Sequence, residues 1–145
     1  MLNNSPFDFD FHVMASKNNG SISTRGEQEA IQNWLDTVCK HNPADIVKLY
    51  APDGVLLGTV AKNIKIGRSE IKKYFDMFVK KKPCGVITSM NVQRYGAVAI
   101  VDGTYTFELK SDKGGREKVP ARYTFVLRQI DNKWYIATHH SSAQP

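Results

Sequence analysis

The chain has 145 residues, 41% of them hydrophobic and 23% charged, which is the size and composition of one globular domain. No stretch approaches the roughly 20 apolar residues that a membrane helix needs. The first residues lack the basic start of a secretory signal. We therefore expect a cytoplasmic protein with no membrane partner.

The net charge of +6 comes from one segment. Eight lysine and arginine residues between 62 and 82 are opposed there only by Glu70 and Asp76. No aromatic residues are interleaved with them as in RNA-recognition proteins, and no helix-turn-helix spacing is present. The segment is predicted to be a solvated helix face, and we expect no nucleic-acid partner.

Two cysteines, Cys39 and Cys84, stand far apart without C-x-x-C or paired histidine spacing. A metal site is therefore not expected. Buried free thiols are the favoured interpretation, which suits a cytoplasmic protein, and a disulfide or a nucleophilic thiol is the alternative.

Residues 1–22 are predicted to form a mobile arm, and residues 23–145 a single domain. The alternative for Phe7–Phe11, where Phe and Asp alternate, is a short strand that pairs with the edge of a neighbouring sheet. Thr24 and Glu27 have the spacing of a capping box, which marks the start of a helix. Apolar residues at helical spacing predict three helices, over Arg25–His41, Pro43–Tyr50 and Ser69–Lys81.

Extended segments follow the helices. Pro52-Asp53-Gly54 is predicted to be a turn, and the strands are expected at Val55–Val60, Gly85–Tyr95, Ala97–Leu109, Lys118–Gln129 and Lys133–Ser141. This order predicts an α+β fold, in which helices cover one face of a sheet. Because Ala97–Val101 is apolar on both faces, we expect a homodimer that buries the second face.

The last strand ends on His139, His140, Ser141 and Ser142. The two histidines should point to opposite faces, one into a cavity and the other toward an interface or solvent. Imidazole can act as a general base, so both are candidate catalytic residues. The alternative is a structural, hydrogen-bonded histidine, because no acid lies beside them in the sequence to orient the ring.

Arg122 lies on the strand face opposite Tyr123, Phe125 and Leu127. It is either exposed or inside a pocket, where a guanidinium suits a carboxylate. An ion pair at the edge of the sheet is the alternative. We also expect four aromatic residues to line such a pocket, with plain core packing as the alternative: Trp34, Tyr50, Tyr74 and Tyr105.

Several segments carry a resemblance to a known family. They are Leu49–Leu57, Gly67–Ile71, Tyr74-Phe75, the D-x-K-W turn at residues 131–134 and the closing H-H-S-S. In this order they resemble the association domain of calcium/calmodulin-dependent protein kinase II. They also resemble its stand-alone bacterial relatives in the nuclear transport factor 2-like (SnoaL-like) superfamily. The resemblance covers Glu27–Pro145.

The resemblance implies a cone-shaped α+β fold, described as an α+β barrel, with a bent antiparallel sheet and three helices on one face around a pocket. In the kinase this domain assembles rings and carries an arginine-lined pocket. Arg122 is the position that best matches a pocket arginine, and Gly103 and Tyr105 lie where a second family arginine is expected. No kinase domain precedes the matched region, so no kinase activity is expected.

Related ketosteroid isomerases use an Asp late in the first strand and a Tyr on the first helix. Gly58 and Trp34 stand at those positions, so isomerase activity of that type is not expected. The leading hypothesis is a stand-alone association-type domain that dimerises through its sheet and binds a small organic ligand, for which a carboxylate is the first candidate. The alternatives are a cofactor-independent isomerase- or cyclase-like enzyme, using His140 or His139 with Arg122, and a pure oligomerisation module.

Overall fold

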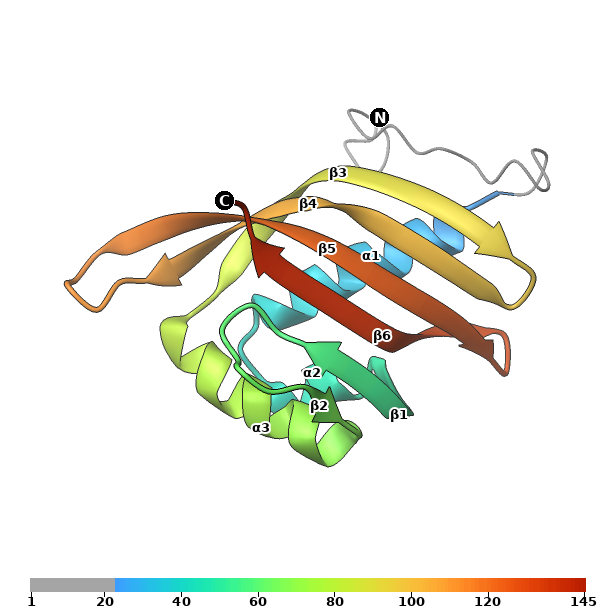
Figure 1. Cartoon of the computed structure of the whole chain (residues 1–145), viewed down its shortest axis with the longest axis horizontal. Coiled ribbons are helices and arrows are strands. Elements are labelled where there is room, and N and C mark those ends of the chain that lie inside the picture. Colours follow the sequence, from blue (N-terminus) through green and yellow to red (C-terminus); the bar gives the residue numbers. More distant parts are fainter. Residues whose placement is uncertain (1–22) are drawn as a thin grey trace.

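The computed structural model describes residues 23–145, so the predicted arm over residues 1–22 lies outside it. The elements follow the expected order of helices first and strands later (Figure 1). They are α1 (Arg25–Val38), α2 (Pro43–Val47), β1 (Tyr50–Leu57), β2 (Lys65–Ile66), α3 (Arg68–Phe78), the 3₁₀ turn η1 (Val79–Lys81), β3 (Cys84–Tyr95), β4 (Val98–Lys110), β5 (Arg116–Ile130) and β6 (Lys133–Ala143). No helix in this part of the chain is both long and apolar enough to cross a membrane.

The strands form one six-stranded sheet in the order β2-β1-β6-β5-β4-β3. β3 to β6 are an antiparallel meander, whereas β1 lies parallel to β6. The two edge strands, β2 and β3, are far apart in this order, so the sheet is open. The α+β class is confirmed, and the expectation of a barrel is wrong.

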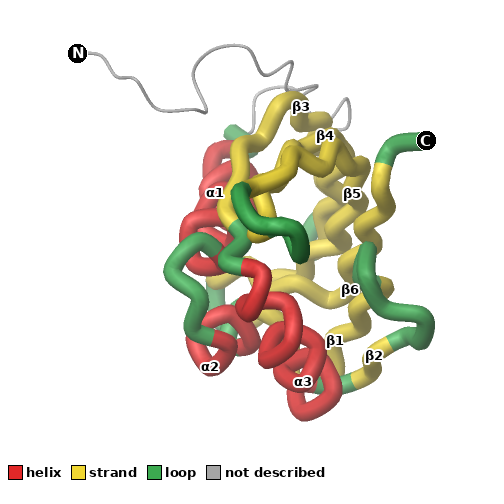
Figure 2. The backbone as a smooth tube through the Cα atoms, turned by 90° about the vertical axis from the view of Figure 1, so that its left-hand side faces the viewer, coloured by secondary structure: helices red, strands yellow, loops and turns green. Residues whose placement is uncertain are grey.

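All three helices pack against the same face of the sheet (Figure 2). α1 buries residues three and four positions apart, Ile31, Trp34, Leu35 and Val38, and α3 buries Ile71, Tyr74, Phe75 and Phe78. These two apolar stripes meet the inner residues of β4, β5 and β6 in a single hydrophobic core. Within residues 23–145, no helix lies over the other face of the sheet.

Two bulges change which side chains face the core. Pro52-Asp53-Gly54 is not a turn between elements but an irregular part of β1, since Tyr50 pairs with Ile136 and Val55 with Thr138. In β6, Ile136 pairs with Leu127 and Thr138 with Val126, which leaves Ala137 as an extra residue. An extra residue in one strand reverses the alternation of its side chains beyond that point.

The predicted capping box is absent. Thr24 makes no capping bond with its side chain and instead accepts a hydrogen bond from Gln28 Nε2 at 3.2 Å. Glu27 is 1% exposed, and its carboxylate lies 3.7 Å from Arg94 Nε on β3. Burial raises the pKa of Glu27, against a backbone hydrogen bond and the Arg94 charge. Glu27 therefore packs toward the sheet rather than back onto its own helix end.

The prediction of two free thiols is wrong, because Cys39 and Cys84 form a disulfide. It connects the end of α1 to the start of β3, across 45 residues of sequence. Closing a loop of that length restricts the unfolded chain and stabilises the fold by about 4 kcal/mol in the chain-entropy description.

Gly103 allows β3 and the Tyr123 side chain to approach β4 closely. A Cβ at this position would overlap the Ser89 carbonyl oxygen and crowd the Tyr123 hydroxyl. That hydroxyl donates to the Ser89 oxygen at 2.8 Å, beside the irregular pairing of β3 with β4. The close approach and the hydrogen bond both depend on a residue without a side chain.

Gly103→Ala is expected to lower the free energy of unfolding by about 2 kcal/mol, since the overlap forces the two strands apart. Thermal unfolding measures this as a drop of several degrees. Gly26→Ala is the matched control, because Gly26 lies in the first turn of α1 and its Cβ would approach Trp134 Nε1 only to 3.3 Å. Equal melting temperatures for the two variants would contradict this account of the close approach at Gly103.

Candidate functional site

A chain of hydrogen bonds crosses the core beneath the helices. Trp34 Nε1 donates to the Tyr50 hydroxyl at 3.1 Å, and that hydroxyl lies 2.9 Å from His139 Nδ1. His139 Nε2 lies 3.2 Å from the Tyr105 hydroxyl, which donates to Ser141 Oγ at 2.7 Å. These polar groups come from α1, β1, β4 and β6. The fold thus brings together four elements that are distant in sequence.

The directions of these bonds fix the state of His139. The Tyr105 hydroxyl has one hydrogen and gives it to Ser141, so it can only accept from His139 Nε2. His139 is therefore protonated at Nε2, and its Nδ1 accepts from Tyr50. Both ring nitrogens are occupied in a neutral imidazole.

Burial explains why the neutral form is retained. His139 is 2% exposed, and burial, with a smaller contribution from the neighbouring His140, lowers its pKa to about 3. Burial also raises the pKa values of Tyr50 and Tyr105 above their usual range, against the hydrogen bonds from Trp34 and to Ser141. The site is therefore uncharged at neutral pH.

Packing holds the imidazole in place. The ring of Phe125 stacks on His139 with the ring centres 3.9 Å apart, and Trp34 meets it edge-on at 4.9 Å. Arg68 fixes the backbone of Tyr50, because its Nε and Nη2 donate to the Tyr50 carbonyl oxygen at 2.9 and 2.8 Å. The hydroxyl of Tyr50 is thereby aimed at His139.

The remaining space in this cluster is small. A cavity of about 10 Å³ lies beside His139, Ser141 and Tyr105, which is room for about one water molecule. The segment after β1 covers it: Thr59 donates to Ser141 Oγ at 2.6 Å, and a Cβ at Gly58 would overlap the ring of Tyr74. Tyr74, whose pKa burial raises to about 12, therefore occupies the place where an acidic side chain at position 58 would have to lie.

The residues predicted to line one pocket divide between the two faces of the sheet. Trp34, Tyr50, Tyr74 and Tyr105 lie inside, with Tyr74 next to the cavity. Arg122 and His140 are exposed on the outer face, where Arg122 Nη2 donates to Ser142 Oγ at 3.3 Å. Thr124, the residue opposite His140, donates to Asp102 Oδ2 at 2.7 Å. The outer pair and the inner aromatic residues therefore cannot contact the same small ligand.

The sequence analysis did not decide which histidine faces the interior. Trp134 and Ile136 alternate inward, and continuing that alternation would place His140 inside. The bulge at Ala137 reverses it, so that His139 and Ser141 point inward instead. Thr59 and Ser141 were not predicted as site residues, and the clustering of polar residues at the end of the last strand was the only signal for Ser141.

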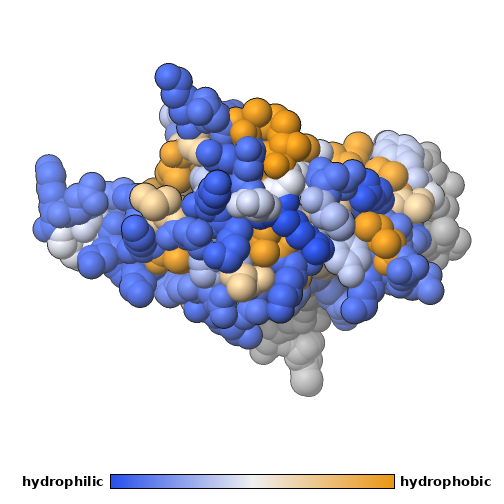
Figure 3. Space-filling model, turned by 90° about the horizontal axis from the view of Figure 1, so that it is seen from below, coloured by the Kyte–Doolittle hydropathy of each residue, from blue (hydrophilic) through white to orange (hydrophobic). Residues whose placement is uncertain are grey.

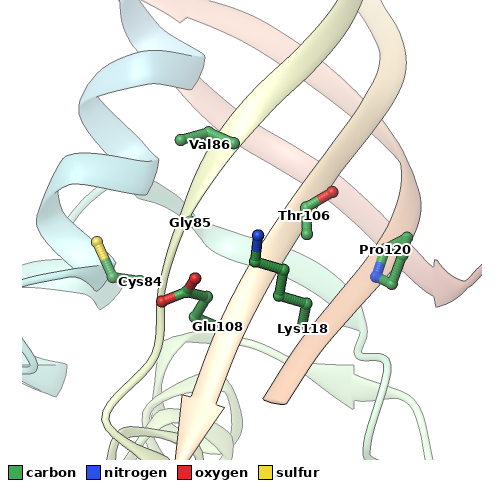
Figure 4. A pocket seen from close by; sticks show the side chains of 7 residues that line it. All are labelled: Cys84, Gly85, Val86, Thr106, Glu108, Lys118 and Pro120. Carbon is green, nitrogen blue, oxygen red and sulfur yellow. The ribbon is translucent and has the colours of Figure 1, made fainter. Parts of the chain in front are cut away.

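A second hollow of about 640 Å³ lies on the outer face, near the start of β3 (Figure 4). Lys118 extends its ammonium group across β4 toward Gly85, and the Cys84 sulfur points away from the hollow toward α1. Most of the exposed surface of the hollow is apolar. It shares no residue with the buried cluster; its lining is Cys84, Gly85, Val86, Thr106, Glu108, Lys118 and Pro120.

Comparison with known proteins assigns this architecture. Residues 26–145 match the family described as calcium/calmodulin dependent protein kinase II association domain. The chain belongs to this family. A protein of Xanthomonas campestris described as such an association domain is 40% identical, with a TM-score of 0.81, and the match covers 90% of this chain and 92% of that one. No curated protein matches the sequence.

More distant structures share the fold alone. A protein of Streptomyces avermitilis described as a dehydratase of the NTF2-like family is 15% identical, with a TM-score of 0.74 over 83% of this chain and 95% of that one. A ketosteroid isomerase-like protein of Erwinia carotovora is 17% identical, with a TM-score of 0.71 over 83% and 96%. The association domain described here thus has the nuclear transport factor 2-like fold that the sequence predicted.

The geometry limits the chemistry that the closed cluster can perform. A general base needs a free lone pair within reach of the substrate proton. The only lone pair of His139 accepts from Tyr50, and the cavity beside it holds no more than about one water molecule. In this closed arrangement His139 orders the core, and its catalytic role stays a prediction that needs the cover to open.

The acid sensitivity of the fold should depend on His139. Its pKa is near 6.5 in an unfolded chain and about 3 in the fold, so below pH 6.5 the unfolded state binds a proton that the folded state does not. The free energy of unfolding should then fall by about 1.4 kcal/mol per pH unit as the pH drops from 6 to 4.

In His139→Gln the part of the pH dependence that comes from His139 should be absent. Urea unfolding at several pH values measures the free energy of unfolding of the variant and of the wild type. His140→Gln, which removes the exposed neighbouring histidine, is the matched control for the loss of an imidazole. Subtracting the variant curve cancels the other titrating groups, including Glu27. Parallel curves for wild type and His139→Gln would show that His139 is not held neutral.

Proposed function

We propose that this protein is a self-association domain that forms a homodimer through the outer face of its sheet. The observation that carries the proposal is an apolar row across the uncovered face. Paired positions place Ile66, Val55, Thr138, Val126 and Ile100 side by side from β2 to β4. Burying such a row against a second copy removes apolar surface from water.

Other exposed apolar side chains extend this surface. Tyr95 and Val98 lie opposite each other at the far end of β3 and β4, and Val86 stands at the hollow. The underside of the molecule, where α3 lies, is mostly hydrophilic with separate apolar patches (Figure 3). The sheet therefore offers the more continuous apolar surface for a partner.

Polar rows beside the apolar row suit a two-fold arrangement. Asp102, Thr124 and His140 pair across β4, β5 and β6, and Thr104, Arg122 and Ser142 form the next row. In a two-fold interface the same patch meets itself, so the Arg122 guanidinium of one copy can face the Asp102 carboxylate of the other. The exposure of Arg122 on this face supports a role for it in the proposed interface.

A second function, the binding of a small ligand in the buried cluster, is favoured by one observation. Ser141 Oγ accepts from both Thr59 and Tyr105, so its own hydroxyl hydrogen remains available to an acceptor that enters the cavity. Since the cavity is small, the segment that carries Gly58 and Thr59 has to move before an organic molecule can enter.

Ile100→Lys should weaken self-association at least tenfold, because it places a charge in the middle of the apolar row. Sedimentation equilibrium over a range of concentrations measures the dissociation constant. Met77→Lys is the matched control: Met77 is 63% exposed on α3, away from the sheet, and its replacement should leave association unchanged. A wild-type protein that stays monomeric at about 100 µM, or equal effects of both variants, would contradict the proposal.

Thermal shifts with a panel of small carboxylic acids and neutral carbonyl compounds test the second function. A ligand at about 100 times its Kd adds about 2.7 kcal/mol to the free energy of unfolding. If the ligand enters the cluster, Ser141→Ala should reduce the shift and Arg122→Ala should preserve it. The reverse pattern would place the ligand on the outer face, and no shift with any compound would leave self-association as the function.

A further inference from the structure

The Cys39–Cys84 disulfide encloses a distinct part of the fold. The segment between the two cysteines contains α2, β1, β2 and α3. It therefore supplies Tyr50, Thr59 and Tyr74, which form one wall of the buried cluster and its cover. The opposite wall belongs to the meander of β4, β5 and β6, which its own hydrogen-bonded ladders hold together.

Strained backbone flanks both ends of this segment. His41 has a φ of 65° and Lys82 a φ of 50°, a left-handed conformation that side chains other than glycine rarely adopt. Such residues persist when the surrounding structure holds them. Here the disulfide and a 2.8 Å contact between His41 Nε2 and the Pro83 carbonyl oxygen tie the two turns together.

The disulfide is within reach of a reductant. Cys84 is exposed and Cys39 is half-buried, and the Cys84 sulfur points toward α1 at the rim of the outer hollow (Figure 4). Charges of both signs lie near this end: Arg116 Nη2 donates to the Lys82 carbonyl oxygen at 2.8 Å, and Glu108 is the residue opposite Cys84 on β4. Exchange at this disulfide would proceed through the thiolate of the attacking cysteine.

We propose that Cys39 and Cys84 form a thiol–disulfide exchange site for a dithiol oxidoreductase. The disulfide holds the enclosed segment against the sheet. In reduction, a thiolate of the oxidoreductase bonds to Cys84 Sγ, and Cys39 leaves as a thiolate that takes up a proton. The second thiolate of the oxidoreductase then bonds to the first sulfur and displaces Cys84. Two electrons pass to the two cysteines, and the oxidoreductase becomes a disulfide; oxidation is the reverse.

The exchange site bears on the compartment of the protein. Accessible disulfides persist in oxidising compartments and are reduced by the thiol pools of the cytosol. The expectation of a cytoplasmic protein drew support from two free thiols, and the disulfide removes that support. The oxidised form, in which the disulfide holds the enclosed segment against the sheet, is the one suited to an oxidising compartment.

Hydrogen exchange tests whether the disulfide holds the enclosed segment in place. The wild-type protein is measured in its oxidised form and again after reduction by dithiothreitol. Reduction should lower the melting temperature by several degrees and speed amide exchange at residues 40–83 while β4 and β5 stay protected. Mass after alkylation reports whether both thiols are free. The double variant Cys39→Ser/Cys84→Ser should have the melting temperature of the reduced wild type, and dithiothreitol should not change it.

Small amounts of thioredoxin, recycled by dithiothreitol, should accelerate the reduction at least tenfold over dithiothreitol alone. Several results would overturn the proposal: no acceleration by thioredoxin, an unchanged melting temperature after reduction, or equal loss of protection throughout the sheet. Protein isolated from its own cells with two free thiols that glutathione redox buffers do not oxidise would overturn it as well. If the double variant fails to fold, the comparison of oxidised and reduced wild-type protein alone tests the proposal.

Discussion

The structure depends on keeping one imidazole neutral in the core. His139 uses both ring nitrogens, one toward Tyr50 and one toward Tyr105, and stacks on Phe125. Removing the hydroxyl of Tyr50 or Tyr105 would leave a buried ring nitrogen without a hydrogen bond, which is costly. The hydrogen bonds therefore specify how α1, β1, β4 and β6 must meet, where apolar packing alone would tolerate several arrangements.

The two faces of the sheet differ in the space that they offer to a partner or a ligand. The interior has a cavity of about 10 Å³, whereas the outer face has an apolar row with charged rows beside it and a hollow of about 640 Å³. Arg122 and His140, which the sequence analysis considered as candidates for a pocket, lie on this outer face. In the described residues the core is filled by its own side chains and one face of the sheet has no helix over it, which is the basis of the proposed self-association.

Local patterns predicted the element types because helical and strand spacing of apolar residues acts over a few positions, although the capping box at Thr24 and the turn at Pro52–Gly54 were wrong. They identified the helices, the meander, and the aromatic residues that gather inside, such as Trp34 and Tyr105. They could not place His139, because the bulge at Ala137 arises from pairing with β5 and leaves no mark in the sequence of β6. The disulfide was missed for the same reason, since only the fold brings Cys39 to Cys84.

The nitrogen-15 NMR spectrum of the imidazole rings tests the neutral His139 most directly. The account predicts that His139 shows a protonated Nε2 and a bare Nδ1 at neutral pH, and that this pattern persists down to about pH 4. A His139 that gains its second proton near pH 6.5, the value of an unperturbed histidine, would contradict the account. It would mean that the cluster is open to water and that the interior, rather than the outer face, should be searched for the function.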